Sequence, residues 1–209
     1  MDCLVKLFKK NLKKINKKNY LREAIENSID AKKSLFLIEE KINLAINVIY
    51  KKIKNGGKVF LCGNGGSAAD AQHLAAEFLV RLRAHINREP IAAISLAMDT
   101  STITACGNDY SFSQIFSRNL VALGSKNDIL IVISTSGRSS NIIQVLKTAK
   151  KMKILRISFL GNNGGLAKKL SDISLIVKSS VTARIQESHI FLGHYIFESV
   201  ENKLIKNYY

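Results

Sequence analysis

The sequence predicts an α/β fold: a single-domain, parallel five-stranded sheet flanked by helices, with further helices at the N-terminus. Three observations support this prediction. Five short, nearly continuous apolar runs follow one another along the chain, which is typical of strands buried on both faces. Segments of helical periodicity separate these runs, an alternation that produces parallel sheets with right-handed crossovers. Two of the runs end in loops of small residues, where such sheets gather their ligands.

Helical patterns come first, over residues 1–55, and the α/β core is expected to occupy residues 56–209 of the same domain. Gly56 and Gly57 end a long amphipathic helix, because glycine readily adopts the conformation that closes helices. A last amphipathic helix is expected from about Thr182 to Lys206. The five strands are predicted at Val59–Cys62, Ile91–Ala97, Ile129–Ser134, Ile154–Leu160 and Ile173–Val177.

The chain is strongly basic, with a formal net charge of +16, and such a balance ordinarily suggests nucleic acid or an acidic membrane as partner. Its lysines are nevertheless spread along the sequence, apart from one cluster at residues 9–18. Leu4, Phe8, Leu12 and Ile15 recur there at helical spacing, which predicts an amphipathic helix with a basic outer face. Aromatic residues do not alternate with these lysines, so a solvated or subunit-packing helix is favoured over nucleic-acid or membrane binding.

Cysteine usage and hydropathy favour a cytoplasmic protein. Cys3, Cys62 and Cys106 are odd in number and lack paired metal-site spacing, which fits a reducing compartment and three inert thiols. The start of the chain does not resemble a signal peptide, because Asp2 and interspersed lysines interrupt its apolar runs. No apolar run approaches the length that crosses a membrane. The 209 residues are 46% hydrophobic, enough to bury a sizeable core.

Two loops rich in glycine and serine carry the main functional signal. The first, Cys62–Ser67, and the second, Ser134–Ser140, each lead from a strand into a helix. Backbone N–H groups and the positive end of the following helix favour an anion there, so we expect a phosphorylated substrate held at two points. Helix capping is a structural alternative for Ser139 or Ser140, but it does not account for the whole serine run. The hydroxyls suited to a phosphate monoester are those of Ser134, Thr135, Ser136 and Ser139.

The first loop also fits the Gly-x-Gly-x-x-Ala pattern of dinucleotide-binding folds, at Gly63, Gly65 and Ala68. That fold needs an acidic residue about twenty positions later to hold a ribose. Residues 80–85 contain none. No nucleotide cofactor is therefore expected.

Candidate acid–base groups occur on two predicted helices. His73, Glu77 and Arg81 follow the first loop at intervals of four and so share one helix face. Gln186 and His194 lie eight residues apart on the final helix, about 80° around its axis, so both can face one cleft. A carboxylate and an imidazole in these places are suited to moving protons.

Four segments resemble the bacterial phosphoheptose isomerases, which have the sugar isomerase (SIS) fold. They are Cys62–Ser67, Gly107–Asp109, Ser134–Gly137 and Arg184–Glu187, in order and at compatible spacing over almost the whole chain. The resemblance implies one SIS domain over residues 1–209, with a flavodoxin-like three-layer sandwich. It also implies an aldose–ketose isomerase that converts sedoheptulose 7-phosphate to D-glycero-D-manno-heptose 7-phosphate. That reaction is the first step of heptose synthesis for lipopolysaccharide or a related surface glycan, and the enzymes are homotetramers with active sites between subunits.

The resemblance assigns roles to individual residues. Glu77 and His194 match the catalytic pair, with Glu77 taking a carbon-bound proton and His194 delivering one, as enediol chemistry requires. His73, Glu77, Gln186 and His194 match positions that bind zinc in some family members, one ion per subunit. A metal on Glu77 and His194 would compete with their proton transfer. Substrate contacts are implied for Asn64, Gly65, Gly66, Ser67, Glu77, Asn108, Asp109, Ser134, Thr135, Ser136, Ser139 and Gln186.

Structural alternatives stay open for some of these residues. Asn108 and Asp109 precede Ser111 and a helical pattern, so capping of that helix would also explain them. His73 alone is equally well explained as an ordinary histidine on a helix face. Ala183 stands where some relatives carry an acidic residue near the substrate, which leaves the fine sugar preference open.

Two other functions use the same fold. One is a non-catalytic SIS tetramer that binds the replication initiator protein, and the other is an isomerase or sensor for hexosamine or pentose phosphates. The presence of Glu77, Gln186 and His194 in one chain favours the enzyme over the binding protein.

Overall fold

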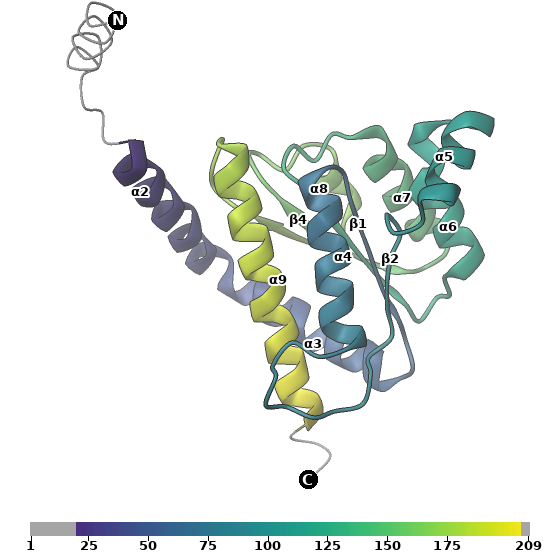
Figure 1. Ribbon diagram of the computed structural model, residues 1–209, viewed down its shortest axis with the longest axis horizontal. Helices are drawn as coiled ribbons and strands as arrows, with labels where there is room; N and C mark the ends of the chain where they lie inside the picture. The colour runs from purple at the N-terminus through teal and green to yellow at the C-terminus, as the bar shows by residue number, and fades with distance from the viewer. Residues whose placement is uncertain (1–19, 206–209) are drawn as a thin grey trace, which may run out of the picture.

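The computed structural model describes residues 20–205, and within that range five strands form one parallel sheet in the order β2-β1-β3-β4-β5. The predicted α/β class is confirmed (Figure 1). The strands are β1 (Val59–Gly63), β2 (Ala93–Ser95), β3 (Ile129–Ser134), β4 (Leu155–Leu160) and β5 (Ile173–Ile176). The helices are α2 (Tyr20–Lys33), η1 (Ser34–Ile38), α3 (Glu39–Lys54), α4 (Gly66–Leu79), α5 (Thr100–Asp109), η2 (Phe112–Gln114), α6 (Ile115–Leu123), α7 (Ser140–Lys151), α8 (Ala167–Leu170) and α9 (Thr182–Ile205).

The strand boundaries differ most from the prediction at β2, which has three residues instead of the seven expected at Ile91–Ala97. β2 is an edge strand that pairs only with β1 in the described sheet. The Ile91 amide donates instead to the carbonyl of Phe78 at 3.0 Å, so the run enters the sheet late. β1 is one residue longer than predicted because Gly63 pairs with Ile133 of β3.

The strand order is that of flavodoxin-like sheets, in which the direction of winding reverses between β1 and β3. At such a switch point the loops after the two strands diverge to opposite faces and leave a crevice at the carboxyl edge. The two loops singled out in the sequence follow β1 and β3. The fold therefore brings both predicted anion loops to the same edge, on neighbouring strands.

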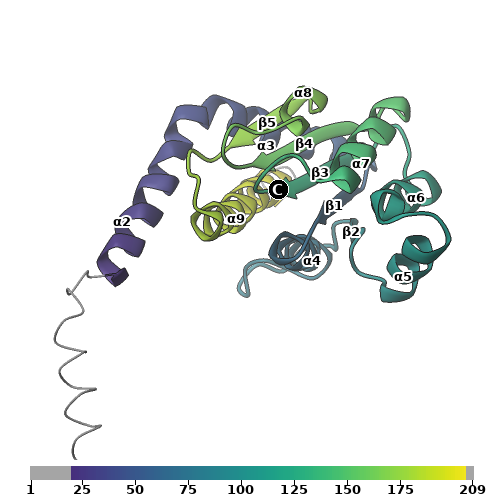
Figure 2. The same ribbon diagram turned by 90° about the horizontal axis from the view of Figure 1, so that it is seen from above.

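Helices cover both faces of the sheet and make three layers (Figure 2). Leu61, Ile131 and Phe159 belong to a core cluster shared with α3, α4 and α9. Phe60 and Val132 point to the opposite face, into a cluster shared with α6 and α7. Alternate side chains of each strand are therefore buried on both sides, which explains why the strands read as continuous apolar runs.

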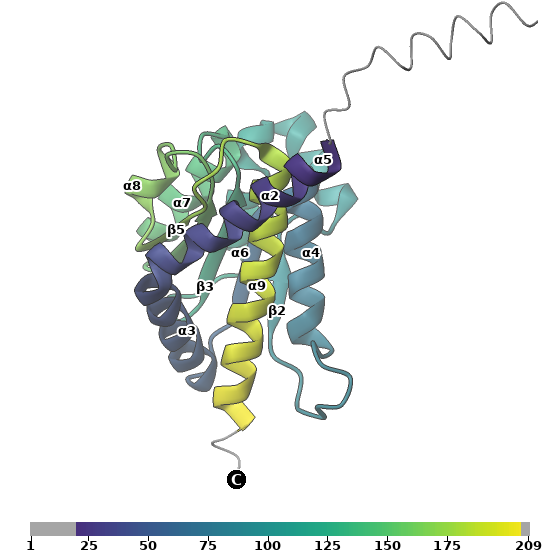
Figure 3. The ribbon, with the colours of Figure 1, turned by 90° about the vertical axis from the view of Figure 1, so that its left-hand side faces the viewer.

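The described part of the N-terminal region is helical, but a 3-10 segment, η1, separates α2 from α3. Figure 3 shows α2 crossing α9 near the start of α9. Ser28 donates to Glu187 Oε2 at 2.9 Å, and Arg184 Nη1 donates to the Ala24 carbonyl at 2.8 Å, so polar bonds tie the two helices. The basic cluster at residues 9–18 and the expected helix end at Lys206 lie outside the described residues. Across residues 20–205, every helix is too short or too polar to cross a membrane.

Candidate functional site

The first loop joins β1 to α4 and is shaped by glycine. Gly65 has φ +56°, a conformation that side-chain-bearing residues rarely adopt, and it immediately precedes α4. The Ser67 amide donates to the Asn64 carbonyl at 3.1 Å, and Ser67 is buried. The loop thus turns sharply into α4, whose positive dipole end lies at the carboxyl edge of the sheet, while the amides of Ser67, Ala68 and Ala69 donate to the carbonyls of Asn64 and Gly65.

An amide pair joins the two loops across the switch point. Asn64 Nδ2 donates to Asn141 Oδ1 at 2.9 Å, and Asn141 Nδ2 donates back to Asn64 Oδ1 at 2.8 Å. Asn141 is 1% exposed and lies in the first turn of α7. Asn141 was not among the predicted residues, because only the pairing of β1 with β3 brings it opposite Asn64.

The second loop is closely packed against residues 161–165. Ser134 Oγ accepts a hydrogen bond from the Gly137 amide at 3.1 Å, and Asn162 Nδ2 donates to the Thr135 carbonyl at 3.0 Å. Gly137 has φ +61°, and a Cβ there would lie 2.1 Å from the Gly164 carbonyl oxygen. Within the described residues the Ser139 side chain makes no hydrogen bond that caps α7, so the capping alternative does not account for it.

A hollow of about 400 Å³ opens beside the second loop, lined by Ser136, Arg138, Asn162 and Asn163. Ser136 Oγ accepts from the Arg138 amide at 3.3 Å. Arg138 is exposed. Hydroxyl and amide groups with a cation at the rim form an environment that favours a phosphate.

α4 and α9 run side by side in the same direction, as Figures 1 and 3 show. At their start the Gln186 amide lies against Gly66, where a Cβ would come within 2.6 Å of Gln186 Nε2. Further along, Gly193 packs on Leu74 so closely that a Cβ would lie 2.5 Å from Leu74 Cδ1. The small residue lets the helix axes approach and brings the following residue of α9, His194, against α4.

His73, Glu77 and His194 meet in this contact. The Nε2 atoms of His73 and His194 are 2.9 Å apart, and His73 Nε2 lies 3.3 Å from Glu77 Oε1. The two rings are edge to face, with centroids 5.1 Å apart. A hydrogen bond between these nitrogens needs one ring to donate and the other to accept, so its direction depends on the tautomer of each ring. The structure therefore places a carboxylate of α4 and an imidazole of α9 in one cluster.

The electrostatics of this cluster follow from partial burial. Burial lowers the pKa of His194, the nearby His73 lowers it further, and the Glu77 carboxylate opposes both effects. Asp70 lies one turn before His73 on α4, and burial raises the pKa of its carboxyl group against the attraction of His73. Asp70 Oδ2 is buried and has no hydrogen-bond partner among residues 20–205. Asp70 was not among the predicted residues, although its spacing of three from His73 places it on the same helix face.

The cluster also has the geometry of a metal site. One ligand atom from each of His73, Glu77 and His194 lies within 4.8 Å of the others. Two imidazole nitrogens and a carboxylate oxygen are a donor set that divalent transition metals accept. Gln186, the fourth residue of the expected set, lies against Gly66, about 12 Å of helix rise before His194.

Three other residues singled out in the sequence lie at or just beyond the ends of helices. Asn108 and Asp109 are the last two residues of α5, and Asn108 Nδ2 donates to Asp109 Oδ1 at 2.9 Å. They close α5, and the N-cap position of the next helix, η2, is Ser111, whose side chain makes no capping hydrogen bond in the described chain. Arg81 does not share a helix face with Glu77, because α4 ends at Leu79. Its guanidinium instead donates to the Ala84 carbonyl at 3.0 Å.

Comparison with known proteins gives the family of this chain. A family model described as the SIS domain matches residues 19–161. A phosphoheptose isomerase of Clostridium acetobutylicum is 45% identical over 190 residues, covering 90% of this chain and 96% of the relative. One from Campylobacter concisus is 45% identical over 187 residues, covering 87% and 97%. Among solved structures, the phosphoheptose isomerase of Neisseria gonorrhoeae superposes with a TM-score of 0.82 at 39% identity, covering 88% of this chain and 98% of that one.

Proposed function

The chain belongs to the phosphoheptose isomerases of the SIS domain family and is an enzyme, and from this premise we propose its reaction and mechanism. The proposed reaction converts sedoheptulose 7-phosphate to D-glycero-D-manno-heptose 7-phosphate, the first step of heptose synthesis for a surface glycan. The observation that carries the proposal is the meeting of Glu77 and His194 across the α4–α9 contact, with ligand atoms within 4.8 Å. A base and an acid at so short a distance from each other can serve the two adjacent carbons of one enediol.

The phosphate is proposed to bind in the crevice at the carboxyl edge. Ser134, Thr135, Ser136 and Ser139 would offer hydroxyls, and the starts of α4 and α7 would offer N–H groups and positive helix ends. His73 lies seven residues into α4 from Gly66, about 10 Å of helix rise from the edge. A phosphate held at the edge would therefore leave room for an extended sugar chain before the acid–base pair, as a seven-carbon substrate with the phosphate on its last carbon requires.

Proton transfer can be followed atom by atom. Glu77 takes a proton from C1, the C–H electron pair forms the C1–C2 double bond, and the carbonyl oxygen on C2 gains a proton to give the enediol. His194 then gives a proton to C2 while the hydroxyl on C1 loses one and becomes the aldehyde oxygen. Two protons leave the sugar and two arrive, so its composition and charge are unchanged. The direction of transfer between Glu77 and His194 reverses when the aldose is the substrate.

We propose that the same cluster binds a zinc ion. His73, Glu77 and His194 would be its ligands, with Gln186 as the fourth expected donor. A zinc ion bound there would order the site and polarise sugar oxygens. It would also occupy lone pairs that Glu77 and His194 need for proton transfer. Metal analysis of protein purified without chelator, together with turnover before and after chelation, distinguishes an activating ion from an inhibiting one.

A homotetramer with sites between subunits is proposed as the working form. Large apolar side chains stay exposed on α2 and α9, among them Leu21 (70%), Ile25 (50%), Phe191 (47%) and Tyr195 (45%). Apolar surface of this kind marks protein–protein contacts.

Cys62 and Cys106 are free and buried, which fits the proposed cytoplasmic location, where thiols stay reduced.

The direct test is incubation of the purified protein with sedoheptulose 7-phosphate, following formation of the aldose. We expect turnover by the native protein and a loss of about 10²- to 10⁴-fold in Glu77→Gln and in His194→Gln, the range that acid–base groups contribute. His85→Gln is the matched control, because His85 is exposed on the loop after α4. Absence of turnover by the native protein, or full activity in both site variants, contradicts the proposal.

A further inference from the structure

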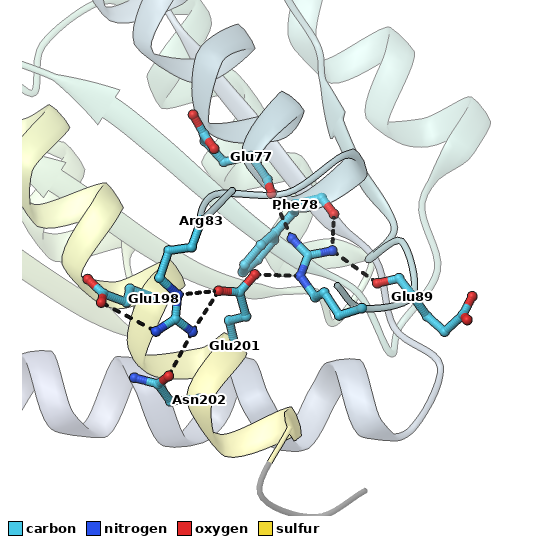
Figure 4. A network of polar contacts seen from close by, with 8 residues as sticks. Glu77, Phe78, Arg83, Glu89, Glu198, Glu201 and Asn202 are labelled. Atoms are coloured by element: carbon cyan, nitrogen blue, oxygen red, sulfur yellow. Dashed lines mark hydrogen bonds and ion pairs between the residues drawn. The ribbon is translucent and has the colours of Figure 1, made fainter. Parts of the chain in front are cut away.

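A buried ionic cluster lies at the C-terminal ends of α4 and α9, far from the carboxyl edge of the sheet where both helices begin (Figure 4). Its centre is Glu201 of α9, which is 1% exposed. Arg88 Nε donates to Glu201 Oε1 at 2.6 Å, and Arg83 Nε donates to Glu201 Oε2 at 2.7 Å. Arg83 also donates to Asn202 Oδ1 at 2.7 Å and lies 3.5 Å from Glu198 Oε1. Both carboxylate oxygens of Glu201 are therefore paired with a guanidinium from the loop after α4.

Arg88 does more than pair with this carboxylate, because it also holds the end of α4. Its Nη2 donates to the Glu77 carbonyl at 2.7 Å, and its Nη1 donates to the Phe78 carbonyl at 2.9 Å and to the Glu89 carbonyl at 3.0 Å. The last carbonyls of a helix have no partner within the helix and need one from outside. One guanidinium, with its side chain 7% exposed, thus bonds the main chain of Glu77 and the side chain of Glu201 at once.

This arrangement connects the two residues of the acid–base pair. Glu201 lies seven residues after His194, two turns along the same face of α9. Between His194 and Glu201 along α9, the ring of Phe197 stacks on that of Phe78 of α4, with centroids 3.7 Å apart and planes within 9°. α4 and α9 therefore touch at three places along their length. Gly193 packs against Leu74 beside His194, the stacked rings follow, and Arg88 joins the C-terminal parts of both helices.

We propose that Arg88, through its bond to Glu201, is a positioning residue for the isomerisation: it fixes the main chain of Glu77 relative to His194. This inference rests on the proposed function of that pair. A buried ion pair is expensive to desolvate and is weak evidence of stability by itself. Lysine cannot reproduce the rigid, forked geometry of the Arg88 guanidinium, since a single ammonium cannot reach two carbonyls and a carboxylate together.

The test compares kcat and KM in Arg88→Ala, Arg88→Lys and a control, each assayed at a temperature where circular dichroism shows it folded. Arg156→Ala is the control, because Arg156 makes a similar forked pair with Asp172 at the other side of the sheet, away from α4 and α9. We expect Arg88→Ala to lower kcat by about ten- to a hundredfold, as a small displacement of catalytic groups does, with KM changed by less than about threefold. Arg88→Lys is expected to recover only part of kcat, and Arg156→Ala to retain the native kcat.

Native kcat in folded Arg88→Ala, or an equal loss in Arg156→Ala, overturns the inference. A crystal structure of Arg88→Ala gives a readout that needs no turnover. We expect the distance between the Cα atoms of Glu77 and His194 to change by on the order of 0.5 Å or more, beyond the tolerance of a catalytic site, and an unchanged distance overturns the inference. Failure of the native protein to isomerise the substrate would instead contradict the proposed function, so the two failures are distinguishable.

Discussion

Replacing His189 by leucine is expected to remove a loss of stability that the native protein suffers in mild acid. His189 lies on the face of α9 that packs on the sheet, is fully buried, and has its ring centroid 6.3 Å from that of Phe159. Neither ring nitrogen has a hydrogen-bond partner in the part of the chain that the structure describes. Burial lowers the pKa of His189 from 6.5 to about 4, and the nearby backbone of Leu160 offsets part of this effect.

The sign and size of the effect follow from proton linkage. Because the pKa is lower in the folded protein, the unfolded chain takes up a proton near pH 6.5 while the folded chain stays neutral until about pH 4. The stability that depends on neutral His189 is therefore complete above about pH 6.5 and is lost as the pH falls toward 4. Between about pH 7 and pH 5, these two pKa values give a loss of about 2 kcal/mol from this one residue.

The assay is urea denaturation of the native protein and of His189→Leu at about pH 7 and pH 5, at one protein concentration so that subunit association contributes equally. Other titrating groups act alike in both proteins and cancel in the difference. We expect the free energy of unfolding of the native protein to fall by about 2 kcal/mol more than that of the variant. His85→Leu, which replaces an exposed histidine, should keep the pH dependence of the native protein.

Equal pH dependence in the native protein and His189→Leu would contradict this prediction. It would mean that the buried ring finds a partner that accepts its proton, so that burial no longer sets its charge. A pH dependence in His85→Leu as weak as that of His189→Leu would likewise show that the effect belongs to histidines in general and not to the buried site.

Two further substitutions test the packing that builds the site. Gly193→Ala should lower the free energy of unfolding by about 1–3 kcal/mol and also lower kcat, because the added Cβ would lie 2.5 Å from Leu74 Cδ1 and force α9 from α4. Gly107→Ala is its stability control in urea melts, since a Cβ there meets no described atom within 4 Å, and an equal loss in both would contradict the argument. Asn141→Ala should raise KM for the phosphosugar and cost about 1–3 kcal/mol of stability, because it leaves the Asn64 amide unpaired. Asn127→Ala, which removes a bond to the Asn55 carbonyl far from the loops, should leave KM unchanged, and steady-state kinetics with an unaltered KM in Asn141→Ala would count against the role of the amide pair.

The sheet was predictable because burial on both faces leaves a plain signal in the sequence. β3 has the predicted bounds, Ile129–Ser134, and all six of its residues are buried. The edge strand β2 was predicted less well, since an apolar run does not show where its backbone amides bond. Ile91 is buried like a strand residue, yet its amide bonds to the end of α4. Arg81 was wrongly placed on the helix face of Glu77 because α4 ends at Leu79, where Arg88 of the following loop bonds the last carbonyls of the helix.

The site was predictable only where one segment of chain builds it. The two glycine loops were found because glycine and serine at the end of a strand have local causes. Asn141 was missed because its importance comes from Asn64, 77 positions away, through the register of β1 and β3. The contact between His73 and His194 could not be derived from either helix alone, since it depends on how closely α4 and α9 pack. Resemblance supplied that pairing, and Gly193 supplies its physical reason.

The meeting of carboxylate and imidazole is a consequence of the topology. α4 follows β1 and α9 follows β5, and both strands belong to one parallel sheet, so both helices start at its carboxyl edge and run back across the same face. Residues near the two starts, Gly66 and Gln186, therefore lie together at the edge, and residues two turns later lie together deeper along the face. A fold of this kind offers a phosphate cradle and a pair of facing helix positions at a fixed spacing. The sequence places a carboxylate and an imidazole, which we propose as the acid–base pair, at those positions and a glycine where the helices must touch.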